Sequence, residues 1–249
     1  MRGLDIWRSG NAQSYAEDYL NPTVSCLCYE AMSEWHLGEM ASSQANMDEA
    51  IALAKELNDM NALALALIWA AALACYERNR AEVDRLTSDL IELSTRHNFS
   101  HFLAIGAIYR GWARSASGDT VQGIPWIEQG IRDYRATGSV LGMPGHIARK
   151  AEALHLADRS SEALELINEA EALAERFEQR YWCAELRRLR GVFLATLGAD
   201  EIQIEASLCA AIRIAREQKS ISLEKRAEGT YLEYQRQNAL GERGFRLHV

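Results

Sequence analysis

The segment YRGWARSASGDTVQGIPWIEQGIR, residues 109–132, holds the serines, aspartate, threonine and glycines that could form a phosphate-binding loop or a nucleophile. Gly118 and Gly123 have the five-residue spacing of a P-loop, but Ile124 and Pro125 follow where that loop needs Lys and Ser or Thr. Without the lysine, the loop lacks the positive charge that holds the outer phosphates. The segment therefore does not predict nucleotide binding.

Ser115 and Ser117 are the candidate nucleophiles of this segment. A hydrolase serine sits in a G-x-S-x-G turn between a strand and a helix, and neither serine has these surroundings. No His or Asp is placed to identify a triad. His97 and His101 could share a helix face as metal ligands, but HNFSH crosses a predicted turn and no third ligand is suggested nearby. We expect a protein that is not an enzyme, with no catalytic residue, cofactor or metal.

The composition is that of a chain that folds into a globular protein in water. Hydrophobic residues make up 48% of the 249 positions, charged residues 25%, and the formal net charge is −8. Binding to nucleic acid needs clustered Lys and Arg, so direct binding to nucleic acid is not expected. The most apolar run, residues 62–76, is shorter than the roughly 20 residues that span a membrane, and it predicts a buried helix.

Five cysteines are scattered through the chain without a C-x-x-C pair: Cys26, Cys28, Cys75, Cys183 and Cys209. Their odd number and spacing predict small buried hydrophobic residues in a reducing compartment. The first ten residues, MRGLDIWRSG, lack the apolar stretch of a secretory signal. We therefore expect a cytoplasmic protein.

A small residue recurs every 40 positions at Gly111, Ala151 and Gly191, and weaker copies are placed at Gly38 and Ala71. A second small or compact residue follows twelve positions later in four units. In the last unit the gap is fifteen, which predicts a three-residue insertion in the turn GADEIQI. These second positions are Ala50, Val83, Gly123, Ala163 and Ala206. Small residues at fixed places let two helices approach closely, so each unit is predicted to be a helical hairpin.

The chain is predicted to be all-α, because apolar residues recur at three- and four-residue steps between turns rich in Gly, Asn, Asp and Ser. Eleven helices are expected near residues 22–41, 46–57, 61–77, 80–97, 100–117, 120–136, 144–157, 160–178, 180–197, 201–218 and 220–238. Pro125 is expected to kink or delay its helix. The predicted architecture is a right-handed α-α superhelix of about five hairpins over residues 21–238, with a lead segment or cap at 1–20 and a tail at 239–249.

Repeating hairpins of this kind resemble the tetratricopeptide repeat, although 40 residues exceeds the usual period of that family. Segments such as RGWARSASGDTVQGI, WIEQGIRDYRATGS and GERGFRL are similar to the C-terminal helical-repeat regions of large bacterial signalling ATPases. In those proteins a nucleotide-binding switch domain precedes the repeats, and a class III adenylate or guanylate cyclase or a winged-helix DNA-binding domain stands at the N-terminus. The resemblance implies a sensor or scaffold module. The ATPase activity does not carry over, because this chain has no P-loop.

In tetratricopeptide-like arrays the first helix of each hairpin lines the concave surface. The residues expected there form a candidate groove for a protein or peptide partner: Trp35, Glu39, Ile108, Trp112, Glu152 and Arg188. Aromatic and arginine side chains are common anchors at interfaces. Packing between neighbouring repeats is an equally open interpretation for each aromatic residue.

These observations predict a non-catalytic interaction or regulatory scaffold, with ATPase, cyclase or DNA-binding domains among its possible partners. Two alternatives stay open. The chain could be a free-standing adaptor, or a gene remnant without effector domains, which can stay folded because each repeat depends mainly on its neighbours. A small enzyme with an unrecognised site is disfavoured, because no triad, paired carboxylates or metal ligands have a defensible geometry.

Overall fold

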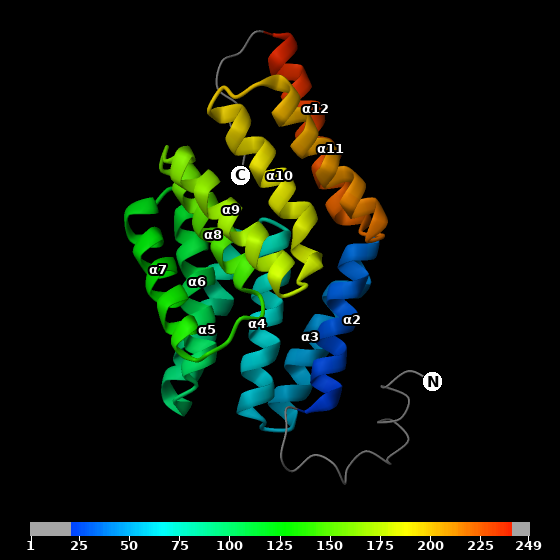
Figure 1. The fold of residues 1–249 in the computed structure, drawn as a ribbon. Coiled ribbons are helices and arrows are strands. Elements are labelled where there is room, and N and C mark those ends of the chain that lie inside the picture. The colour runs from blue at the N-terminus through cyan, green and yellow to red at the C-terminus, as the bar shows by residue number, and fades with distance from the viewer. Residues whose placement is uncertain (1–20, 241–249) are drawn as a thin grey trace.

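The computed structural model describes residues 21–240 of the chain. The lead segment predicted at residues 1–20 and nearly all of the tail predicted at 239–249 lie outside the described residues. Within the described part the helices follow one another as antiparallel pairs joined by short turns (Figure 1). This arrangement confirms the predicted all-α solenoid.

Eleven α-helices and one 3-10 turn make up the described residues. Five hairpins come first: α2 (Pro22–Leu37) with α3 (Met40–Glu56), α4 (Met60–Tyr76) with α5 (Arg80–His97), α6 (Ser100–Ala116) with α7 (Thr120–Ala136), α8 (Met143–Leu156) with α9 (Ser160–Arg176), and α10 (Cys183–Thr196) with α11 (Glu201–Glu217). The 3-10 turn η2 (Arg180–Trp182) leads into α10, and α12 (Ile221–Ala239) ends the series. All eleven predicted helices are present, and Pro125 lies inside α7 without delaying its start.

The turns between the helices repeat every 20 residues. The residues with positive φ that form this series are Gly38, Asn58, Arg78, Asn98, Gly118, Gly138, Asp158, Glu178 and Gly198. A residue in the left-handed region ends a helix, because its backbone turns the chain away from the helix axis. The repeating element is therefore one helix with its turn, and the 40-residue period contains two of them.

Gly38, with a φ of 84°, is one of these turn residues and not the small packing residue that was predicted for the first unit. Counting back by 40 from Ala71 reaches Ala31, which is fully buried in α2. The Ser43 hydroxyl of α3 donates a hydrogen bond to the Ala31 carbonyl oxygen over 2.7 Å. The small position thus recurs at an unchanged spacing in all five units, at Ala31, Ala71, Gly111, Ala151 and Gly191.

The small residues bring paired helices into backbone contact. A Cβ atom at Gly111 of α6 would lie 2.6 Å from the carbonyl oxygen of Gly123 in α7. The buried Ser115 hydroxyl donates to the Gly111 carbonyl oxygen over 2.9 Å, and Asp119 caps α7 by accepting from the Gln122 N–H. The polar residues that raised the question of a catalytic loop therefore serve a helix contact and a helix cap.

The last hairpin differs from its prediction. A Cβ atom at Gly191 would lie 2.6 Å from the Leu208 side chain, whereas Ala206 is exposed, so the predicted pairing of Gly191 with Ala206 is wrong. The positive-φ residue after α11 is Lys219, one position beyond the 20-residue series. The hairpin contains one inserted residue instead of three.

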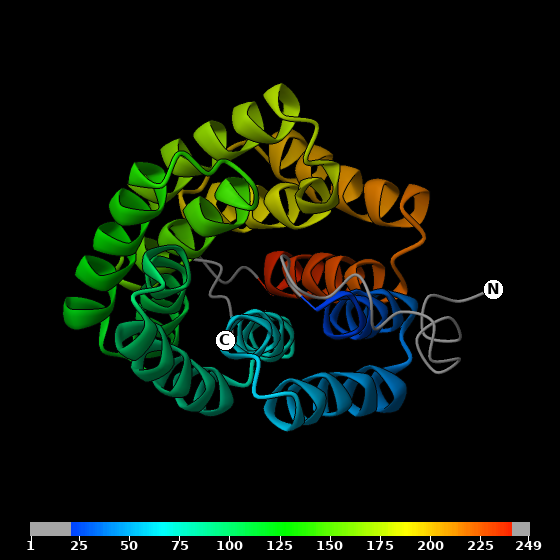
Figure 2. The same ribbon diagram turned by 90° about the horizontal axis from the view of Figure 1, so that it is seen from below.

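The superhelix closes on itself, because α12 lies beside α2 (Figure 2). The first helices of the hairpins contact one another in the order α2, α4, α6, α8 and α10, and α12 contacts both α10 and α2. The Ser222 hydroxyl donates to the Trp35 carbonyl oxygen over 2.5 Å, and His36 Nδ1 lies 2.7 Å from the Ser220 hydroxyl. We call the side of this closed series of helices that faces its axis the inner surface.

Two further predictions concern membrane spanning and the burial of the cysteines. No helix within residues 21–240 has the length and apolar character required to span a lipid bilayer. All five cysteines are free; Cys28 and Cys75 are buried, but Cys26 and Cys209 are exposed, which corrects the prediction that all are buried. Cys26 and Cys28 lie two positions apart and so point to different sides of α2.

Candidate functional site

The six residues of the predicted groove differ in accessibility. Five are only 0–4% exposed: Trp35, Ile108, Trp112, Glu152 and Arg188. Glu39, at the start of α3, is exposed. The five buried residues are covered by neighbouring side chains in the unbound chain, and a role in partner binding stays a prediction for all six.

Charged side chains from separate parts of the chain meet at the inner surface. This inner cluster consists of Arg78, Glu152, Glu185, Arg188 and Arg226. Arg78 forms an ion pair with Glu152. A carboxylate oxygen of Glu185 lies 2.6 Å from Arg188 Nη2, 3.7 Å from Arg226 Nη1 and 3.9 Å from Arg78 Nη2. One set of charges thus joins the α4–α5 turn, α8, α10 and α12.

The arginines of the inner cluster keep Glu185 ionised. Burial by itself raises the pKa of Glu185, but Arg188, Arg226 and Arg78 outweigh burial and hold that pKa well below its ordinary value. Burial also lowers the pKa of Arg226; Glu185 opposes this, whereas Arg78 and Arg188 add to it through repulsion. The inner cluster therefore has three positive and two negative side chains, and its positive charges repel one another.

Stacked aromatic rings border the inner cluster. The ring of Tyr76 stacks on Trp35 at a centroid distance of 4.6 Å and on Trp182 at 6.0 Å. The Arg226 guanidinium lies 5.6 Å from the Trp35 ring centroid and donates a hydrogen bond to the Tyr76 carbonyl oxygen. The Arg78 guanidinium lies 5.7 Å from the Trp112 ring centroid. Cation–π contacts of this kind bring α12 and the α4–α5 turn onto the inner surface.

Arg149 of α8 lies at the Trp182 end of the aromatic row. Its guanidinium is 4.0 Å from the Tyr109 ring centroid and 5.2 Å from that of Trp182. Arg149 Nη2 donates to the Tyr109 hydroxyl over 2.7 Å, and the whole residue is only 5% exposed. Arg149 has no ion pair with a carboxylate within residues 21–240. It is thus a buried cation held by aromatic neighbours.

Four charged residues of the inner surface were missed by the sequence analysis: Arg78, Arg149, Glu185 and Arg226. The 40-residue period could have indicated some of these contacts from the sequence. Tyr109 and Arg149, which are hydrogen-bonded, are 40 positions apart. Trp112 and Glu152, also 40 apart, both contact Arg78. Residues at equivalent positions of neighbouring hairpins lie close together, so an alignment of the repeat units could have predicted these contacts.

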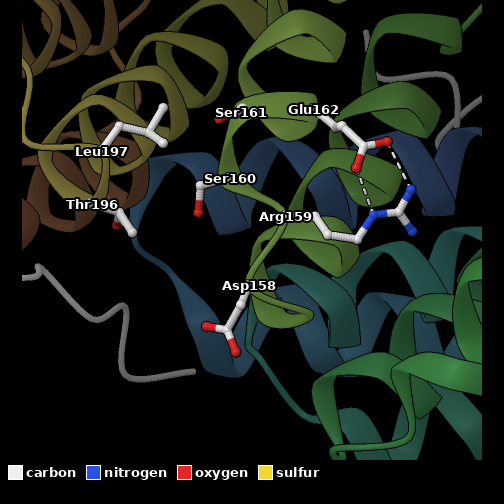
Figure 3. A pocket seen from close by; sticks show the side chains of 7 residues that line it. All are labelled: Asp158, Arg159, Ser160, Ser161, Glu162, Thr196 and Leu197. Atoms are coloured by element: carbon white, nitrogen blue, oxygen red, sulfur yellow. Dashed lines mark hydrogen bonds and ion pairs between the residues drawn. The ribbon is translucent and has the colours of Figure 1, made fainter.

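A separate pocket of about 410 Å³ lies at the turn between α8 and α9 (Figure 3). Arg159 Nε donates to Glu162 over 2.7 Å, so these two charges are already paired. The Ser160 hydroxyl is 3.0 Å from His155 Nδ1, but Ser160 is only 5% exposed. This hydrogen bond joins the end of α8 to the start of α9, which is a packing role.

Within residues 21–240 no group of three or more His, Cys, Asp and Glu residues could hold a metal ion. The rings of His97 and His101 contact Phe99 and Tyr134, at centroid distances of 5.5 Å and 5.0 Å.

The paired helices and their regular turns define a tetratricopeptide-like helical-repeat protein with a charged, aromatic inner surface.

Known proteins share this fold. A family described as anaphase-promoting complex subunit 5 matches residues 7–76. The structure of PlcR from Bacillus thuringiensis, in complex with the peptide PapR7 and DNA, superposes with a TM-score of 0.67 and 14% identity, covering 84% of this chain and 76% of PlcR. The apo form of RapI gives a TM-score of 0.60 and 11% identity, covering 96% of this chain and 92% of RapI. At these identities the two structures show a common fold and no more.

A curated bacterial relative extends the comparison. Uncharacterized protein R02095 of Rhizobium meliloti (strain 1021) is 26% identical over 197 residues. The alignment covers 79% of this chain and 19% of the relative. The chain thus spans about a fifth of the length of the relative it matches.

Proposed function

We propose that the chain is a non-catalytic, partner-binding module that receives a protein or peptide segment on its inner surface. The observation that carries this proposal is the inner cluster, which joins the α4–α5 turn, α8, α10 and α12 through Glu152 and Glu185. Buried ion pairs add little to stability compared with apolar packing of the same volume. The charged groups of this cluster can therefore exchange their contacts for those of a charged partner at a modest net cost, although removal of a single charge leaves its neighbours uncompensated.

The similar proteins support the same proposal. PlcR was solved with a bound peptide, and its fold matches this chain along 84% of the length. The greater length of the Rhizobium relative supports a further proposal, that this module works with the effector domains of a signalling ATPase, a cyclase or a transcriptional regulator. A DNA-binding domain would then make any contact with nucleic acid, because this chain has a net charge of −8.

The position of α12 suggests how binding would be transmitted. Arg226 of α12 lies 3.7 Å from Glu185 of α10, and Ser222 bonds the backbone of Trp35 in α2. A partner that engages the inner cluster competes for these contacts and alters how firmly α12 closes the ring. We propose that this change in α12 is the signal passed to other domains.

A defined peptide pool tests the proposed function. The purified full chain is immobilised and incubated with synthetic random heptapeptides, and the retained peptides are identified by mass spectrometry. We expect a reproducible subset to be enriched over bare resin. Glu152→Gln should change that subset, because it removes the ion-pair partner of Arg78.

A surface variant supplies the control for this experiment. Glu169→Gln removes one partner of an exposed ion pair with Arg135 on the outer helices. It should leave the enriched subset unchanged. Circular dichroism confirms that both variants keep their helices. Failure of the wild-type chain to enrich any peptide, or identical subsets for Glu152→Gln and wild type, would contradict binding at the inner surface.

A further inference from the structure

One face of α2, the first helix of the array, is exposed where every later first helix is covered. Cys26 and Ser33 are exposed, and Tyr29, which lies between them on this face, is 57% exposed. The residues at multiples of 40 from Cys26 are all buried: Ala66, Gly106, His146 and Leu186. The equivalents of Tyr29 and Ser33 in α6, α8 and α10 are buried as well. The face of α2 is therefore the exception in the series.

The covering element in the later hairpins is the second helix of the preceding hairpin. The helices α4, α6, α8 and α10 each contact the second helix that comes before them. A Cβ atom at Gly106 of α6 would lie 3.1 Å from Cγ1 of Ile91 in α5. The ring of His146 in α8 lies 4.8 Å from the ring of Tyr134 in α7. The exposed face of α2 thus has the geometry of a surface that receives a second helix.

The lead segment has the residue pattern of a second helix at the required register. The second helices α3, α5, α7 and α9 bury the same four positions of the 40-residue period. In α3 these positions hold Ser43, Met47, Ala50 and Ala54. Forty positions earlier the sequence has Gly3, Trp7, Gly10 and Ser14. Both stripes consist of one large residue among small ones, which suits a helix that packs closely on its neighbours.

The turn series and the charges agree with this register. Twenty positions before Gly38 the sequence has Asp18, a residue type that adopts a positive φ at Asp158 of the same series. In the fourth hairpin Lys150 of α8 lies 3.0 Å from Glu128 of α7. The positions 120 residues earlier hold Glu30 in α2 and Arg8 in the lead segment. The two positions carry opposite charges in both places, with the signs exchanged.

We propose that residues 3–16 cover the exposed face of α2 as the second helix of a further hairpin, with Arg8 beside Glu30. The lead segment contacts Cys26 and Tyr29 in the N-terminal half of α2, whereas α12 contacts the C-terminal end of α2 at Trp35. Fixing α2 from both ends helps to keep the superhelix closed. This proposal concerns α2 and does not depend on the proposed function.

Thiol labelling of the full chain tests this docking. Cys26 and Cys209 are both exposed among the described residues, so each serves as a reference for the other. Each thiol is labelled in the folded chain and in urea, and mass spectrometry gives the ratio of the two rates. We expect this ratio to be about tenfold or more lower for Cys26 than for Cys209, because the lead segment covers Cys26 and leaves α11 open.

Two kinds of variant show whether the lead segment gives the protection. Gly10→Pro should abolish it, because a proline in the interior of a helix breaks the helix. Arg8→Glu places two carboxylates together and should raise the labelling rate of Cys26 about two- to fivefold. Combining Arg8→Glu with Glu30→Arg should restore the wild-type rate. Arg96→Glu is the matched control, since it reverses an arginine in an exposed ion pair with Glu92 on α5 and should leave Cys26 unchanged.

Separate results would overturn each part of the proposal. Equal relative rates for Cys26 and Cys209 in the wild-type chain would show that α2 is not covered. Protection of Cys26 that persists in Gly10→Pro would exclude a helical lead segment as the cover. Protection that increases with protein concentration would identify a second copy of the chain as the occupant. Failure of the double variant to restore the wild-type rate would overturn the pairing of Arg8 with Glu30.

Discussion

Substitution of Glu185 by Gln tests whether the inner cluster holds the ring of helices closed. The variant keeps the shape of the side chain but removes the negative charge that lies 2.6 Å from Arg188, 3.7 Å from Arg226 and 3.9 Å from Arg78. Removing one partner of a buried ion pair costs about 3–5 kcal/mol, because the remaining charge is left uncompensated. The side chains of Arg78 and Arg226 are 24% and 19% exposed, so water compensates part of the loss. We therefore expect a decrease in the free energy of unfolding near the lower limit, about 3 kcal/mol.

The assay is thermal unfolding at pH 7, followed by circular dichroism at the helix band. A loss of this size corresponds to a lower Tm by roughly 6–12 °C for a chain of this length. Glu217→Gln is the matched control, since Glu217 pairs with Arg213 over 2.7 Å but is 60% exposed. That variant should change the free energy of unfolding by about 0.5 kcal/mol or less. If Glu185→Gln is as stable as Glu217→Gln, the arginines do not depend on Glu185 and the reasoning about the inner cluster is wrong.

Three other predictions concern stability. The pKa of Glu185 is lower in the folded than in the unfolded chain, so the contribution of ionised Glu185 to the free energy of unfolding is full above about pH 4.3 and is lost as the pH falls further. The midpoint of urea unfolding should therefore fall less for Glu185→Gln than for wild type when the pH is lowered from 7 to 3. Gly111→Ala should destabilise by about 1–2 kcal/mol in urea unfolding, because its Cβ would lie 2.6 Å from the Gly123 carbonyl oxygen, whereas Gly229→Ala, with nothing within 4 Å, should stabilise by about 0.5–1 kcal/mol. Equal effects of the two would contradict the close α6–α7 contact. Trp112→Ala should cost about 3–5 kcal/mol in thermal unfolding, because Trp112 is fully buried; a loss below about 1 kcal/mol would instead favour an accessible groove residue.

The helices and their period could be predicted from the sequence because their causes are local. Apolar spacing defines each helix, and glycines such as Gly118, Gly138 and Gly198 end helices by adopting a positive φ. The first unit was misaligned because Gly38 has the right size but belongs to the series of turns. A glycine can serve either close packing or a left-handed turn, and residue type alone does not separate these roles.

Ring closure and the inner surface were decided by the tertiary structure. Small rotations between successive hairpins add up along a solenoid, and their sum brings Ser222 of α12 to Trp35 of α2, 187 positions away. The sequence supplied Trp35, Trp112, Glu152 and Arg188 as inner-surface residues, but exposure and burial of such side chains depend on what covers them. The sequence by itself determined an all-α repeat of helical hairpins. Only the packed superhelix could place three arginines around Glu185 and bring Arg149 close to the Tyr109 and Trp182 rings, because these contacts join helices that are distant in the chain.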